Sequence, residues 1–169
     1  MTAVLDDDSL GEQHKHIFRR VKRGLYIGHI DRDSDIYIKS ASGRTLLHAA
    51  VVAGNVENVE MLMKKGKDKL VNMQDNHGDT ALALVARNGN IDMVKYIVER
   101  ENGFHERLLE IHNSKYEIPI LIAADNEHKE LTTYLYSKTP TTQFEGSNSH
   151  NGVLLFERCI TAKIFGKQI

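Results

Sequence analysis

The sequence predicts an all-α fold, a solenoid of stacked helix–turn–helix units joined by short hairpin-like turns. Two segments, residues 43–59 and 78–94, carry nearly the same pattern 35 residues apart. Each segment opens on a glycine, Gly43 or Gly78, and each is followed by apolar residues at helical spacing. A repeat of this length is typical of supersecondary units that bury their apolar faces against one another.

The first unit, residues 40–74, contains two expected helices. Thr45 is placed to cap a helix that runs to about Ala53, because a threonine side chain can accept from an early backbone N–H. Gly54 is expected to end this helix in the left-handed conformation that glycine tolerates. The second helix is predicted from apolar residues at helical spacing: Val56, Val59, Leu62 and Met63.

The second unit, residues 75–112, repeats this design. Thr80 begins its first helix and Gly89 ends it. Its second helix presents one apolar face made of Ile91, Val94, Ile97 and Val98.

The third unit, residues 113–138, is degenerate. It keeps a proline, Pro119, and a pair of alanines, but Ile118 replaces the threonine and Glu127 stands where glycine is expected. Its second helix is predicted from Leu131, Tyr134 and Leu135.

The remaining segments are expected to be atypical. Residues 1–12 form a disordered acidic tail, and residues 13–39 a degenerate N-terminal capping repeat with a short helix ended by Gly24 and an extended stretch at 36–38. Residues 139–150 are polar and predict a flexible loop. Residues 151–169 predict an incomplete C-terminal repeat with one helix before Gly166. We expect this chain to be a truncated form of a longer protein.

The first unit resembles a known family. The sequence Thr45-Leu46-Leu47-His48-Ala49-Ala50 with a later Gly-Asn pair resembles the ankyrin repeat. The family pattern has proline where this chain has Leu46 and Ala81, and the second unit has Ala83 in place of the histidine. The resemblance implies the ankyrin fold, and it implies a hydrogen-bonding role in the turn for His48.

Further details resemble the ankyrin region of plant ankyrin–transmembrane proteins (PGG-domain, accelerated-cell-death-like). These details are the segment 17–24, the segment 42–48, a long loop at 66–72 in the first repeat, and Asn-Gly-Val-Leu-Leu at 151–155. The resemblance implies roles in defence, cell-death control or salt-stress signalling. Full-length members carry a C-terminal membrane domain, for which this chain shows no counterpart.

Composition restricts the cellular setting. Hydrophobic residues make up 41% and charged residues 27% of the 169 residues, as in ordinary soluble folds. No apolar run approaches the ~20 residues that span a bilayer, and residues 1–12 lack the pattern of a secretion signal. A single cysteine suits a reducing compartment. We expect a cytoplasmic or nuclear location, with the plasma membrane for full-length relatives.

The sequence offers no pattern for catalysis or for a cofactor. Nine histidines are scattered along the chain, and His14 and His16 would face different ways on a helix. Cys159 has no neighbouring cysteine, and neither a nucleophile elbow nor a phosphate-binding glycine loop is present. We therefore expect no metal, no cofactor, no small-molecule substrate and no enzymatic activity.

Partner contacts are expected in a groove made of turn tips and inner helices. Packing leaves these positions unconstrained, so they are candidates for binding other proteins. The tip residues are Ser42, Arg44, Asn76, His77, Asp79, Ser114, Lys115 and Glu117. The inner-helix residues are Val52, Ala53, Arg87, Asn88, Asp125 and Asn126.

The predicted function is a non-enzymatic protein–protein interaction module or scaffold. A first alternative is a regulatory fragment that competes with a membrane ankyrin protein for its partners. A second is a nuclear or nucleic-acid-associated factor that uses the basic cluster of Lys15, Arg19, Arg20, Lys22 and Arg23. The net charge of −1 gives no general attraction to nucleic acid, and the mixed charges of the tips favour a protein partner. The sequence leaves the oligomeric state open.

Overall fold

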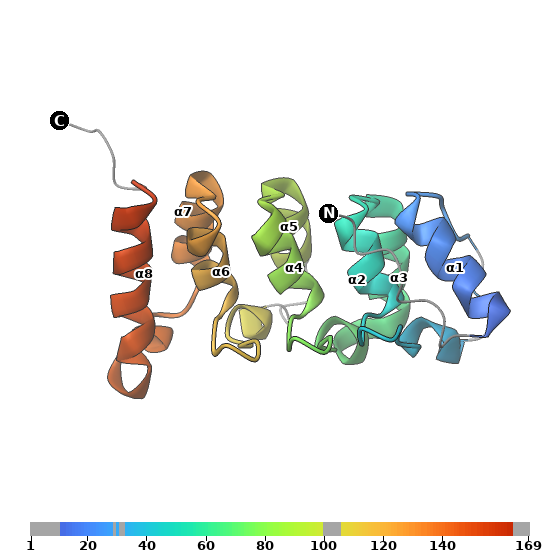
Figure 1. Cartoon of the computed structure of the whole chain (residues 1–169), viewed down its shortest axis with the longest axis horizontal. Coiled ribbons are helices and arrows are strands. Elements are labelled where there is room, and N and C mark those ends of the chain that lie inside the picture. Colours follow the sequence, from blue (N-terminus) through green and yellow to red (C-terminus); the bar gives the residue numbers. More distant parts are fainter. Residues whose placement is uncertain (1–10, 29, 31–32, 100–105, 164–169) are drawn as a thin grey trace. The chain divides into compact units, whose positions relative to one another are not determined.

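The computed structural model describes residues 11–28, 30, 33–99 and 106–163. In this described part every regular element is helical, and Figure 1 labels the helices α1 to α8 and colours them along the sequence. The chain divides into two compact units, one ending at Leu84 and one beginning at Val85. Each unit is described separately below.

The first unit is built around a helix pair. It contains α1 (Glu12–Lys22), the 3-10 turn η1 (Asp33–Tyr37), α2 (Leu46–Val52) and α3 (Val56–Val71). Helix α2 packs against both α1 and α3, and η1 packs against α3. Phe18, Leu47 and Leu62 are among its fully buried side chains. The expected helix pair of residues 40–74 is therefore present.

Two local expectations in this unit are wrong. Residues 36 and 37 are not extended, because η1 continues to Tyr37, and Ile36 is buried in the core. The expected loop at 66–72 is helical up to Val71, with a break at Lys67, whose φ is 46°. Burial of Leu70 and Val71 favours this second helical piece, because helical spacing turns both side chains inward.

The second unit contains the end of α4 and four further α-helices among the described residues. Helix α4 (Ala81–Asn88) begins in the first unit and ends in the second, where α5 (Ile91–Val98) and the 3-10 turn η2 (Glu106–Leu109) follow. Helix α6 (Pro119–Asp125) packs against α7 (Lys129–Lys138) and against α8 (Ser149–Thr161). The degenerate third repeat therefore forms a helix pair like that of the first repeat.

The predicted loop at 139–150 is largely structured. It contains two 3-10 turns, η3 (Thr141–Gln143) and η4 (Gly146–Asn148), and α8 begins at Ser149 rather than after the loop. Thr139 and Gln143 are buried, which ties this segment to the unit. The acidic tail lies outside the described residues up to position 10, and Glu12 already belongs to α1.

The first helices of the repeats end in the same way. Gly54, Gly89 and Glu127 follow α2, α4 and α6 with φ angles of 69°, 72° and 59°. The N–H groups of Gly54 and Glu127 donate back to Val51 and Ala124 at 3.2 and 3.1 Å. This left-handed ending reverses the chain so that a second helix can start two residues later. Glu127 adopts this conformation although it is not glycine. The third repeat therefore keeps the same helix ending, at a cost in backbone strain.

Candidate partner-binding surface

Three hairpin turns of the same form precede α2, α4 and α6. In each turn two backbone hydrogen bonds close a loop of five residues. The first residue donates its N–H to the carbonyl of the fifth, and the fourth donates its N–H to the carbonyl of the first. The turns are 40–44, 75–79 and 113–117, with donor–acceptor distances of 2.8 to 3.1 Å. Two backbone N–H groups and two backbone carbonyls of each turn are therefore paired within the turn itself.

A buried side chain at the base of each of the last two turns completes this support. The Asp75 carboxylate accepts from the N–H groups of His77 and Asp79 at 2.8 and 3.1 Å. The Asn113 amide oxygen accepts from the N–H groups of Lys115 and Glu117 at 2.9 and 3.0 Å. The exposed side chains of the tips are not needed for these bonds, so they are available for contacts with other molecules.

The fourth residue of each turn lies in the left-handed region. It is Gly43 or Gly78 in the first two turns, but Tyr116, with φ 62°, in the third. The Tyr116 side chain is 74% exposed, which makes it the most prominent aromatic residue of that tip. Sequence reasoning missed Tyr116 as a surface residue, although its alignment with Gly43 and Gly78 could have identified it.

In the first unit, two of the predicted contact residues also hold neighbouring turns together. The side-chain amide of Asn76 donates to the carbonyl of Ala41 at 2.8 Å. Arg44 Nε lies 3.3 Å from the Asp75 carboxylate, as an ion pair with a half-exposed cation. Gly43 lets Asn76 approach, because a Cβ at Gly43 would lie 2.3 Å from the Asn76 side chain.

His48 connects the first repeat to the next turn. Its Nδ1 accepts from the Thr45 N–H at 3.1 Å, so its Nε2 carries the proton and donates to the Asp79 carbonyl at 3.1 Å. Burial lowers the pKa of His48 below its usual 6.5, and it outweighs the opposing influence of the Asp79 hydrogen bond and the Asp75 charge. His48 therefore serves as a neutral structural link, in agreement with the role that the resemblance implies.

In the second unit, one arginine of α8 gathers three groups. Arg158 pairs with the buried Glu117 carboxylate through Nη2, donates to the Leu121 carbonyl at 2.8 Å, and places Nε 3.3 Å from Asp125 Oδ1. Burial raises the pKa of Glu117, but the hydrogen bonds from Arg158 and Asn113 outweigh it and leave the pKa below its usual 4.5. This cluster fastens α8 to the third turn and to the end of α6.

The structure separates the predicted contact residues by exposure. Asp79 and Glu117 are buried, with 2% and 7% exposure, so the expectation that packing leaves their side chains accessible is wrong. Both are the fifth residue of their turn and face the interior. The tips are formed by the residues that precede them in the turn. The partly exposed residues are Ser42, Arg44, Ala53 and Arg87. The exposed ones are Val52, Asn76, His77, Asn88, Ser114, Lys115, Asp125 and Asn126. Binding by these residues stays a prediction.

The chemistry of the remaining side chains gives no further site. Within the described residues, no three histidine, cysteine, aspartate or glutamate side chains gather in a way that could hold a metal ion. Cys159 is buried in α8, and this burial raises the pKa of its thiol. None of the helices in the described ranges has the length and apolar character required to cross a membrane.

Comparison with known proteins agrees with the repeated architecture. A family model described as ankyrin repeats in three copies matches residues 21–108, more than half of the chain. The potassium channel AKT1 of Arabidopsis thaliana is 37% identical over 87 residues, which are 52% of this chain and 10% of the channel. Notch-regulated ankyrin repeat-containing protein A of Danio rerio is 36% identical over 58 residues, which are 34% of this chain and 50% of that protein. The chain therefore spans half or less of these relatives.

A solved structure supports the fold independently. A chain in the crystal structure of the yeast ribosomal protein Rps3 in complex with its chaperone Yar1 superposes with a TM-score of 0.63 at 23% identity. The superposition covers 75% of this chain and 93% of that chain. Ankyrin repeats are protein–protein interaction modules that use extended surfaces for binding. The repeated turns, the helix pairs and the family match together show that the chain belongs to the ankyrin repeat family.

Proposed function

We propose that this chain is a non-enzymatic module that binds partner proteins through its hairpin tips and the adjoining ends of the helices that follow them. One observation carries the proposal. The tips are held in shape by backbone hydrogen bonds and by the buried bases Asp75 and Asn113, while His77, Ser114 and Lys115 remain exposed. Side chains with no role in the fold are the ones that selection can adapt to a partner.

The partner class follows from the chemistry of the exposed tips. In the first unit the tips present neutral polar groups, the imidazole of His77 and the half-exposed Arg44 cation, beside the half-exposed Val52. In the second unit the third tip combines Lys115 with the aromatic ring of Tyr116. Aromatic and cationic residues are frequent anchors in protein interfaces. We therefore expect a folded protein or a peptide with acidic and apolar groups to face the second unit.

The experiment compares partner capture by tip variants with capture by a control variant. There are two tip variants: His77→Glu, and the double variant Lys115→Glu with Tyr116→Asn. Asparagine is chosen at position 116 because it tolerates the left-handed backbone. The control is Glu60→Lys, on the exposed face of α3. Partners captured by the unchanged chain are purified, and their affinity is measured by calorimetry. The tip variants should weaken binding by about tenfold or more, and the control should not. Equal affinity for all variants contradicts the proposal.

We propose further that the partners belong to plant defence or stress signalling. The resemblance at 17–24, 42–48 and 151–155 supports this, and one relative comes from Arabidopsis. A regulatory fragment that competes with a membrane ankyrin protein would use the same tips. Co-expression separates the two roles. A competitor displaces the membrane protein from a shared partner, whereas an independent module binds partners that the membrane protein does not.

The compartment is proposed to be the cytoplasm or the nucleus. The nucleic-acid alternative is supported by exposed cations on the first unit: Arg19 and Arg20 of α1, and Arg23 directly after α1. A fluorescent fusion locates the chain in the cell. Binding to DNA that falls steeply with salt and is lost when these three arginines become glutamine would favour that alternative.

A further inference from the structure

Helix α8 ends as the first helix of a repeat ends. Lys163 lies directly after its C-cap with φ 52°, and its N–H donates to the Ile160 carbonyl at 3.0 Å. Glu127 at the end of α6 has φ 59° and donates to Ala124 at 3.1 Å. After Glu127 the chain enters α7, which packs against α6. The end of α8 therefore has the geometry that ends a first helix.

One face of α8 is packed and another is not. Asn151, Leu155 and Cys159 are buried on the packed side, where α8 meets α6. Apolar residues on the other side are largely exposed: Val153 at 63%, Phe156 at 60% and Ile160 at 56%. Their spacing of three and four residues makes a continuous stripe along the helix. Contiguous exposed apolar surface of this kind marks an interaction site.

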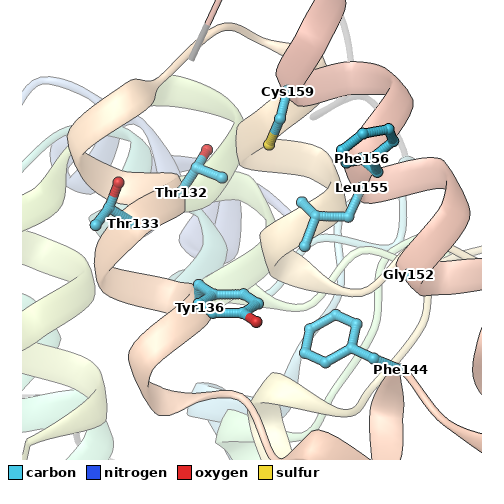
Figure 2. A pocket seen from close by; sticks show the side chains of 8 residues that line it. All are labelled: Thr132, Thr133, Tyr136, Phe144, Gly152, Leu155, Phe156 and Cys159. Carbon is cyan, nitrogen blue, oxygen red and sulfur yellow. The ribbon is translucent and has the colours of Figure 1, made fainter. Parts of the chain in front are cut away.

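A pocket lies beside this stripe, between α7 and α8. Its volume is about 380 Å³, and it is mostly apolar. Figure 2 shows Tyr136 of α7, Phe144 after η3, and Leu155, Phe156 and Cys159 of α8 around it. The rings of Tyr136 and Phe144 are 5.8 Å apart. In the wall, the buried Thr132 hydroxyl has no hydrogen-bond partner among the described residues. The pocket thus offers an apolar cavity with one unsatisfied polar group.

We propose that this pocket receives a short amphipathic helix from a different protein. This helix packs on α8 as α7 packs on α6. The packing of α7 on α6 shows how a second helix covers a first helix in this unit. The pocket adjoins that packing, because the buried Thr132 of α7 also lines the pocket. The other second helices of this unit, α5 and α7, have 8 and 10 residues, which sets the length of the expected helix. Its apolar side chains, three and four residues apart, cover Phe156 and Ile160. This surface shares no residue with the hairpin tips.

The experiment uses the full chain and a peptide probe. The peptide carries residues 90–99 of this chain, the sequence of a natural second helix, with a lactam staple to hold the helix and a fluorescent label. Binding is measured by fluorescence anisotropy, and the site is mapped by amide chemical shifts. The variants Phe156→Glu and Ile160→Glu each replace an exposed apolar side chain of α8. Val56→Glu makes the same change at a 45% exposed position of the first unit and serves as the matched control.

The expected result is saturable binding of the peptide, with shift changes at Tyr136, Phe144 and Cys159. Each α8 variant should weaken binding by about tenfold or more, while Val56→Glu should leave it unchanged. Thermal melts establish that the α8 variants remain folded, and Ile160→Glu serves if Phe156→Glu does not fold.

Three results would overturn the proposal. Equal affinity of the α8 variants and the unchanged chain shows that the peptide does not use this pocket. Self-association of the chain that Phe156→Glu abolishes shows that a second copy occupies it. A gain of about tenfold in peptide affinity on deleting residues 164–169 shows that this segment of the chain occupies it. None of these results bears on the tip variants, so the two proposals fail independently.

Discussion

His48 on α2 donates its Nε2 proton to the backbone carbonyl of Asp79, 31 positions later in the chain. The first repeat thereby fixes the turn that starts the second repeat. The bond is buried, because His48 is fully buried and Asp79 is 2% exposed. A single imidazole thus satisfies backbone groups in two consecutive repeats, the Thr45 N–H and the Asp79 carbonyl.

The variant His48→Ala should therefore lower the free energy of unfolding by about 2–4 kcal/mol. It leaves two buried backbone groups without partners and creates a cavity beside them. Urea unfolding followed by circular dichroism measures the change. The variant His77→Ala, at an exposed tip, should change stability by less than about 0.5 kcal/mol. A loss below about 1 kcal/mol for His48→Ala would show that the link contributes little.

The lowered pKa of His48 also predicts a pH dependence. The unfolded chain takes up a proton on this residue near pH 6.5, while the folded chain takes it up only at lower pH. The contribution to stability is therefore constant above pH 6.5 and decreases as the pH falls from 6.5 toward the lowered pKa. Urea unfolding at a series of pH values, compared between the unchanged chain and His48→Ala, measures the pH-dependent contribution of His48 to stability. Parallel curves for the two proteins would contradict the assignment.

Arg158 should be important for the docking of α8. Replacing it by methionine leaves the buried Glu117 carboxylate without its cation, which should cost about 3 kcal/mol of stability. The pKa of Glu117 should rise above its present lowered value, because burial is then opposed only by the Asn113 hydrogen bond and the charge of Lys115. Urea unfolding and a carboxylate NMR titration measure the two effects. Lys129→Met, at an exposed position of α7, is the control. A Glu117 pKa that does not move would refute the pairing.

Replacing Glu127 by glycine should make the folded chain more stable. Its φ of 59° strains a side chain that has a Cβ, whereas Gly54 and Gly89 adopt the same conformation without strain. Glu127→Gly should raise the unfolding free energy by about 0.5–1 kcal/mol, after the entropic cost of glycine is included. Glu130→Gly, within α7, should lower it by up to about 1 kcal/mol. A loss of stability in Glu127→Gly would show that the left-handed conformation costs nothing here.

The fold was predictable because its determinants are local. Thr45, Gly54 and the apolar spacing of α3 are read from neighbouring residues, and the same pattern at Thr80 and Gly89 repeats them. The break at Lys67 was not predictable, because the helical piece beyond it forms only when Leu70 and Val71 meet the core. The 3-10 turn that buries Ile36 depends on tertiary packing in the same way.

The site was predictable only in part. Position in the repeat identified the tips, and His77, Ser114 and Lys115 are exposed as expected. It did not reveal that Glu117 meets Arg158, because that pair joins residues 41 positions apart and lies outside the repeated pattern. Asp79 was misassigned because a polar residue near a turn suggests the surface, whereas this one lies inside the turn.

The self-contained hydrogen bonding of the turns has a practical consequence. A library that randomises positions 77, 114 and 115 would alter recognition while leaving the anchors at Asp75 and Asn113 intact. Selection from such a library could redirect the molecule to new targets without redesigning its scaffold.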